Sequence, residues 1–115
     1  MELTHKDVNN ARLIEVEGER LDAAVAIRFK DEMRLLTDGG PERVVLDLSN
    51  VEFLDSSGLG AVVAAMKQVG ATRKLELAGL TPAVKKVFSL TRMDTVFTIH
   101  LDAETALGSD HARAS

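Results

Sequence analysis

The sequence predicts a single domain of the α/β class. Strand and helix patterns alternate from Asp22 to the C-terminal region, after two strand patterns that indicate a hairpin. The run Val44–Leu48 is apolar apart from one aspartate and rich in β-branched residues, which is typical of a strand buried on both faces of a sheet. At 115 residues, the chain has the length of one domain with one modest core.

The composition narrows the functional classes. Hydrophobic residues at 45% and charged residues at 28% are ordinary for a soluble globular domain. No apolar run reaches the roughly 20 residues of a membrane helix, and the N-terminal residues lack the layout of a signal peptide. The absence of cysteine excludes disulfides and thiolate metal sites, so we expect a cytoplasmic protein without metal or cofactor. A net charge of −4, with Phe as the only aromatic residue type, argues against direct nucleic-acid binding.

The N-terminal third is predicted to hold a hairpin and a helix. Leu3–Val8 and Leu13–Val16 are strand patterns separated by the turn-prone Asn9-Asn10. Apolar residues then recur at helical spacing over Ala23–Leu36, with Asp22 as the expected N-cap. The sequence Asp-Gly-Gly-Pro at 38–41 is a suitable stop for that helix.

The C-terminal third continues the alternation. A helix is expected to start at Pro82 behind the N-cap Thr81, because proline is well tolerated at the first helical position. The remaining predicted elements are a strand Lys74–Ala78, a last strand Thr95–Leu101 and a short helix Ala103–Leu107 capped by Asp102. We therefore expect the domain to cover residues 1–107 and a frayed tail to cover 108–115.

The most informative segment follows the buried strand. A short apolar piece, Val51–Leu54, leads into Asp55-Ser56-Ser57-Gly58, after which a helical pattern begins. Asp and Ser cap helix N-termini, because their oxygens accept hydrogen bonds from backbone N–H groups that lack partners there. This is also the edge of an α/β sheet where functional groups gather.

The helix after Ser56 combines two kinds of face. Leu59, Val62, Val63, Met66 and Val69 form a stripe that should face the core, and the other faces carry Gly58, Gly60, Ala61, Ala64 and Ala65. Small side chains let another backbone approach closely. From the pattern alone, a neighbouring helix of the same domain is the favoured occupant of that face, and a docking protein is the alternative.

Several catalytic chemistries lack their signature. Gly58-Leu59-Gly60 misses the third glycine of a dinucleotide fingerprint, and the two serines do not lie in a nucleophile elbow. The histidines His5, His100 and His111 are scattered singly.

A serine that is itself modified by another enzyme fits the sequence better. A phosphate on Ser56 or Ser57 would carry about −1.5 to −2 charge at the positive end of a helix, so the fold should tolerate it while a partner is repelled.

The stretch LDLSNVEFLDSSGLGAVVAAMKQV closely resembles the STAS-domain anti-sigma factor antagonists. The resemblance extends over nearly the whole chain, and its most specific part is D-S-S-G-L-G. It implies a small mixed β-sheet with helices mainly on one side. It also places Asp22 at an acidic position near the partner surface, although the spacing from Gly18 is one residue longer than usual in the family.

The resemblance implies a partner switch that regulates transcription indirectly. The unmodified protein would bind an anti-sigma factor that is also a serine kinase, and phosphorylation of Ser56 would release it. A PP2C-like serine phosphatase would restore the unmodified form. The expected partner-binding residues are Asp22, Asp55, Ser56, Ser57, Gly58, Leu59, Gly60, Ala61 and Ala64, and no residue is assigned a catalytic role.

Two alternatives remain open. The chain could be a STAS accessory subunit of a transporter or lipid-transport complex, in which the Ser56 region is an interface without phosphorylation. A small enzyme with a serine nucleophile is the third hypothesis, and it lacks an evident general base.

Overall fold

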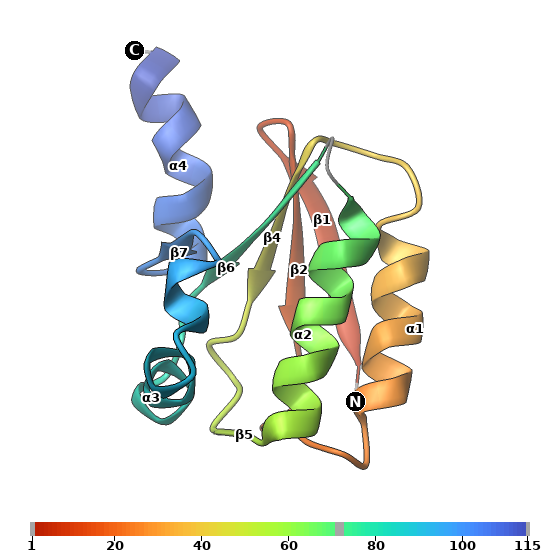
Figure 1. The fold of residues 1–115 in the computed structure, drawn as a ribbon. Coiled ribbons are helices and arrows are strands. Elements are labelled where there is room, and N and C mark those ends of the chain that lie inside the picture. Colours follow the sequence, from red (N-terminus) through yellow and green to blue (C-terminus); the bar gives the residue numbers. More distant parts are fainter. Residues whose placement is uncertain (1, 71–72, 115) are drawn as a thin grey trace.

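The computed structural model describes residues 2–70 and 73–114, with side chains through residue 108. Figure 1 shows two neighbouring helices, α1 and α2, on one face of a twisted sheet and α4 set apart from them. The elements in chain order are β1 (Leu3–Val8), β2 (Ala11–Val16), β3 (Arg20–Leu21), α1 (Ala26–Leu36), β4 (Arg43–Asp47), β5 (Phe53–Leu54), α2 (Ser56–Val69), β6 (Lys74–Ala78), α3 (Pro82–Leu90), the 3-10 helix η1 (Met93–Thr95), β7 (Ile99–His100) and α4 (Ala103–Ala114).

The main sheet is mixed and has the strand order β1-β2-β4-β6-β7. β1 runs antiparallel to β2, whereas the other neighbouring pairs are parallel. β3 and β5 form a separate parallel pair of two residues each, which was not predicted from the sequence. The α/β class and the small mixed sheet are confirmed.

The predicted hairpin is present, with a tight turn at Asn9 and Asn10. Both asparagines have positive φ, 51° and 65°. Two such residues match the twist of the flanking strands in a two-residue hairpin, and asparagine tolerates this conformation better than most residues. The tight turn lets β2 begin at Ala11, two residues earlier than predicted.

Burial on both faces of the sheet explains the apolar run of β4. Val44 and Leu46 belong to the large core that also contains residues of α1, α2 and α3. Val45 points to the opposite face and packs in a smaller cluster with Ala106 and Leu107 of α4. Three helices therefore cover one face and α4 covers part of the other, which confirms the prediction of helices mainly on one side.

The last predicted strand, Thr95–Leu101, is wrong in extent. Arg92 has a positive φ of 61° and opens the 3-10 helix η1, so the chain turns before it can extend. The Thr95 hydroxyl closes this turn by donating to the Arg92 carbonyl at 2.6 Å. Only Ile99 and His100 remain to pair with β6.

The final helix is longer than predicted. Asp102 does cap it, because its Oδ1 accepts a hydrogen bond from the Thr105 N–H at 2.7 Å. The helix continues beyond Leu107 to Ala114, through a segment that begins with Gly108 and contains two alanines. The division into a domain over 1–107 and a frayed tail over 108–115 stays a prediction.

Within residues 2–70 and 73–114, no helix has both the length and the apolar character needed to span a bilayer.

Candidate functional site

Asp55 organises the start of α2. It is the N-cap residue, with an extended backbone, and its Oδ1 accepts a hydrogen bond from the Gly58 N–H at 2.8 Å. This satisfies one of the N–H groups that have no acceptor within the helix. Oδ2 accepts a second hydrogen bond, 3.2 Å long, from the Ala23 N–H in the β3–α1 loop. One carboxylate therefore caps the helix and ties a second segment to it.

Ser56 and Ser57 are the first two residues of α2, and both are exposed. The serines do not cap the helix themselves, because Asp55 occupies the N-cap position. Neither hydroxyl makes a hydrogen bond to another residue in the part of the chain that the structure describes. Their backbone N–H groups lie at helical positions without an intrahelical acceptor. Two accessible hydroxyls thus stand at the positive end of a helix dipole.

Gly58 allows β3 to approach α2 closely. A Cβ atom at this position would lie only 1.9 Å from the Leu21 carbonyl oxygen and 3.0 Å from Leu54 Cδ1. No side chain fits there without a shift of the backbone. The glycine is therefore required by the packing of β3 and β5 against the first turn of α2, which holds the serines in place.

Asp22 lies beside this turn, but it does not cap α1 as predicted. Its Oδ1 accepts from the Ala24 N–H at 3.1 Å, and its carbonyl accepts from the Val25 N–H at 3.1 Å. The carboxylate is thus used in a tight turn, and α1 begins only at Ala26, behind an N-cap residue Val25 that offers no side-chain acceptor. The hydrogen bond between Ala23 and Asp55 still brings Asp22 next to the start of α2, and its role in partner binding stays a prediction.

The remaining predicted partner-binding residues divide between surface and interior. Gly60 is exposed, and Leu59 and Ala64 are half-buried. Gly58 and Ala61 are buried inside the domain, as is Ala65, while α1 packs alongside α2. Gly58 is covered by Leu21 and Leu54, and Ala61 and Ala65 belong to the large core, so packing within the domain accounts for these positions. They are not available to another protein.

Arg20 and Phe53 also belong to this region, although neither was predicted from the sequence. The Arg20 guanidinium carbon lies 4.1 Å from the centroid of the Phe53 ring, and Nε is 3.1 Å from Asp22 Oδ2. Phe53 is exposed beside the buried Leu54, but Val51, two residues earlier, is buried as well, so period-two alternation would not have marked Phe53 as the outward residue. Arg20 lies next to Phe53 only because β3 pairs with β5.

The described residues contain no group of three His, Asp or Glu side chains that could hold a metal ion. The charges near the start of α2 are mostly negative. Glu19 and Glu52 are exposed, and the Glu19 carbonyl accepts from the Glu52 N–H at 2.7 Å, which brings the two residues together. Together with Asp22 and Asp55, they make the segments next to the serines acidic.

Comparison with known proteins gives a consistent result. A family profile described as the STAS domain matches residues 3–106. The anti-sigma-F factor antagonist RsfB of Mycobacterium tuberculosis is 26% identical over 105 residues, which cover 91% of this chain and 85% of RsfB. A STAS-domain containing protein of Pseudomonas aeruginosa is 30% identical over 87 residues, or 75% of this chain and 84% of that protein.

Solved structures share the fold. The anti-sigma factor antagonist SpoIIAA in its unphosphorylated form superposes with a TM-score of 0.77 at 19% identity, covering 96% of this chain and 97% of SpoIIAA. A sulfate transporter family protein from Wolinella succinogenes gives a TM-score of 0.73 at 17% identity, covering 95% of this chain and 92% of that one. At these identities the structures establish the fold alone, and the same fold serves regulators and a transporter family.

Proposed function

Because the chain belongs to the STAS domain family, we propose that it is an anti-sigma factor antagonist controlled by phosphorylation of Ser56. The observation that carries the proposal is the position of the Ser56 hydroxyl, exposed on the first residue of α2 behind a complete Asp55 cap. The names of relatives such as RsfB support the regulatory role. The chain is a substrate and binding partner in this proposal, and it performs no catalysis.

The proposed cycle is a partner exchange in the cytoplasm, where ATP and sigma factors are found. The unmodified protein binds an anti-sigma factor that is a serine kinase. Ser56 Oγ then attacks the γ-phosphorus of ATP held by the kinase, an O–P ester bond forms, ADP leaves, and a base of the kinase takes the hydroxyl proton. A PP2C-like phosphatase later hydrolyses the ester and releases inorganic phosphate.

The cap geometry explains how modification could change binding without unfolding the domain. Asp55 already satisfies the Gly58 N–H, so a phosphate on Ser56 displaces no hydrogen bond of the helix. The helix dipole and the free N–H groups of the first turn favour the added negative charge. For a partner seated on this surface, the phosphate adds both bulk and charge beside Asp55.

The kinase reaction tests the proposal directly. The protein is incubated with its cognate kinase and ATP, and the phosphate is mapped by mass spectrometry of peptides. We expect one phosphate on Ser56, unchanged in Ser57→Ala and absent in Ser56→Ala. A phosphate mapped to Ser57 or to another residue would contradict the assignment.

The accessory-subunit hypothesis predicts a different partner on the same surface, and the shared fold of the Wolinella protein keeps it as the second candidate. Affinity purification from the native cell under mild conditions separates the two. A kinase recovered with the wild-type protein and reduced by Ser56→Asp supports the switch. A permease or transport ATPase recovered equally with both proteins supports the subunit.

A further inference from the structure

Arg20 is held in place but keeps most of its hydrogen-bonding capacity. Its Nε donates to Asp22 Oδ2 at 3.1 Å, and its guanidinium lies over the Phe53 ring at 4.1 Å. The side chain is nevertheless 62% exposed, and no further hydrogen bond involves it among the described residues. The terminal N–H groups of the planar guanidinium therefore face water, in a geometry that suits phosphate.

Three contacts place Arg20 close to the phosphorylation site. β3 pairs with β5 so that Arg20 lies beside Phe53, and at most about 11 Å of chain separates Phe53 from Ser56. The next residue, Leu21, packs its carbonyl against Gly58. Ala23 is hydrogen-bonded to Asp55. The segment that carries Arg20 is thus fastened to the first turn of α2.

The direction of the side chains follows from the buried residue between them. Leu21 is fully buried, so its neighbours Arg20 and Asp22 face the opposite, outer side of the short β3–β5 pair. Ser56 is exposed as well. The guanidinium and the hydroxyl are therefore both open to solvent at this end of the domain.

The charges around Ser56 favour a movement of Arg20 after phosphorylation. Within residues 17–25 and 50–60, Arg20 is the only Lys or Arg, against the five carboxylates of Glu17, Glu19, Asp22, Glu52 and Asp55. A phosphate dianion offers three acceptor oxygens and about twice the charge of the Asp22 carboxylate. Asp22 Oδ1 would keep its hydrogen bond to the Ala24 N–H, so the loop need not unfold when Oδ2 loses Arg20.

We propose that the Arg20 side chain has two positions. It contacts Asp22 in the unmodified protein and moves to the phosphate when Ser56 is modified. The exchange moves the guanidinium off Phe53 and exposes the ring face. A partner that contacts this surface then meets two changes, one at Ser56 and one at Phe53. The inference rests on the proposed phosphorylation of Ser56. In it, Arg20 carries the effect of the phosphate to the surface around Phe53.

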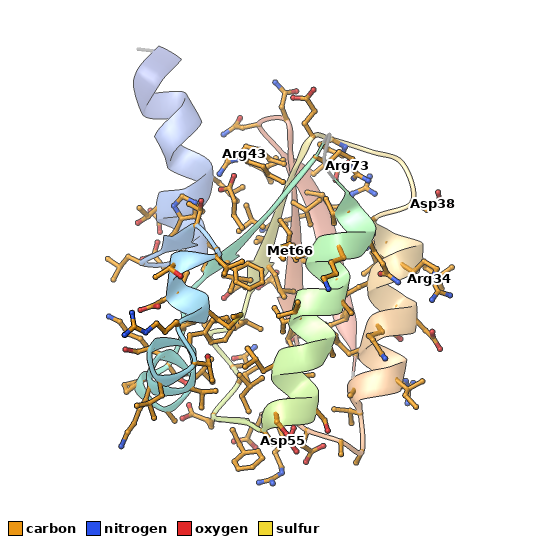
Figure 2. All side chains as sticks on the ribbon, viewed as in Figure 1. Arg34, Asp38, Arg43, Asp55, Met66 and Arg73 are labelled. Carbon is orange, nitrogen blue, oxygen red and sulfur yellow. The ribbon has the colours of Figure 1, made fainter. Side chains whose placement is uncertain are left out.

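The test uses full-length protein with phosphoserine installed at position 56 during synthesis, so that no kinase is needed. The second ionisation of the phosphate is titrated by phosphorus NMR in the wild-type sequence, in Arg20→Gln and in Arg34→Gln. Arg34 is a matched control because it is 67% exposed, has a weak contact to Asp31 at 4.0 Å, and lies near the far end of α1 (Figure 2). Both substitutions remove one positive charge.

Contact with Arg20 stabilises the dianion, so Arg20→Gln should lower the acid dissociation constant of the phosphate at least twofold, whereas Arg34→Gln should leave it unchanged. The ring protons of Phe53 should shift on phosphorylation in the wild-type sequence and not in Arg20→Gln. Equal effects of the two substitutions, or none, would overturn the inference. Because the phosphoserine is installed, a failure of the kinase to modify Ser56 would refute the proposed function without deciding this result.

Discussion

Two charged clusters lie at opposite ends of the sheet, and they differ in burial. The buried cluster stabilises the fold, whereas the exposed one can contact another molecule. Arg43 and Asp55 mark these ends in Figure 2. In the first cluster, Arg43 contacts both Glu76 carboxylate oxygens, at 2.7 and 3.1 Å, and His100 Nε2 lies 2.7 Å from Glu76 Oε1. In the second, Asp55, Asp22 and Arg20 border the exposed serines. The first cluster is enclosed by the fold, whereas the second leaves donors and hydroxyls open to water.

The enclosed cluster serves the architecture. Arg43 also donates to the Ala106 carbonyl at 3.0 Å, so the same guanidinium joins β4, β6 and α4. Burial by itself would raise the pKa of Glu76, but the hydrogen bonds from Arg43 and His100 outweigh it and hold the pKa below its ordinary value. A buried charge with several partners of this kind is costly to disturb.

The largest expected effect comes from breaking the enclosed cluster. Arg43→Met should lower the free energy of unfolding by about 3 kcal/mol, because Glu76 stays buried with one partner fewer. Urea denaturation measures the change, and Arg34→Met is the control, since its ion pair is exposed and long. An equal effect of the two substitutions would show that the cluster is not a structural centre.

Two glycines of α2 test the packing of the open end. Gly58→Ala should cost about 2 kcal/mol, because the new methyl group meets the Leu21 carbonyl and forces β3 away from the helix. Gly60→Ala has open space around it and should stabilise the domain by up to about 1 kcal/mol through helix propensity. Thermal unfolding of both variants compares them. Destabilisation by Gly60→Ala as large as that by Gly58→Ala would contradict the close approach of β3.

The enclosed cluster should also have a smaller effect, on the pH dependence of the free energy of unfolding. The ordinary pKa of Glu76 is 4.5 and the folded value is lower, so its stabilising contribution is fully present above about pH 4.5. The contribution is lost as the pH falls through the lowered folded pKa. Unfolding free energies measured against pH should therefore decline less steeply below pH 4.5 in Glu76→Gln than in wild type. Parallel curves would mean that Glu76 titrates as it does in the unfolded chain.

Much of the fold could be predicted from local patterns. The strands β4 and β6, the hairpin at Asn9 and the start of α2 follow from apolar runs, turn residues and capping chemistry within a few positions of each other. The β3–β5 pair could not be predicted in this way, because two-residue strands carry no periodicity. Its existence depends on contacts between residues more than thirty positions apart, such as the Glu19 carbonyl with the Phe53 N–H.

The site was predictable to a similar degree. A capped helix start at Asp55-Ser56-Ser57 follows from the sequence, but the choice of Asp55 rather than a serine as the N-cap residue does not. The starting point of α1 was mispredicted because Asp22 uses its oxygens in a tight turn, which competes with capping. Arg20 could not be assigned to the site, because its distance from Ser56 along the chain hides the contacts that join β3 to α2.

The central claim is that modification of Ser56 changes what the domain binds and leaves the domain itself intact. The decisive measurement compares unmodified protein with protein carrying phosphoserine at 56, by circular dichroism with urea denaturation and by calorimetric titration with the kinase. We expect the same spectrum and unfolding midpoint, and kinase binding weakened at least tenfold, or about 1.4 kcal/mol. Loss of helical signal on modification, or unchanged kinase affinity, would contradict the claim.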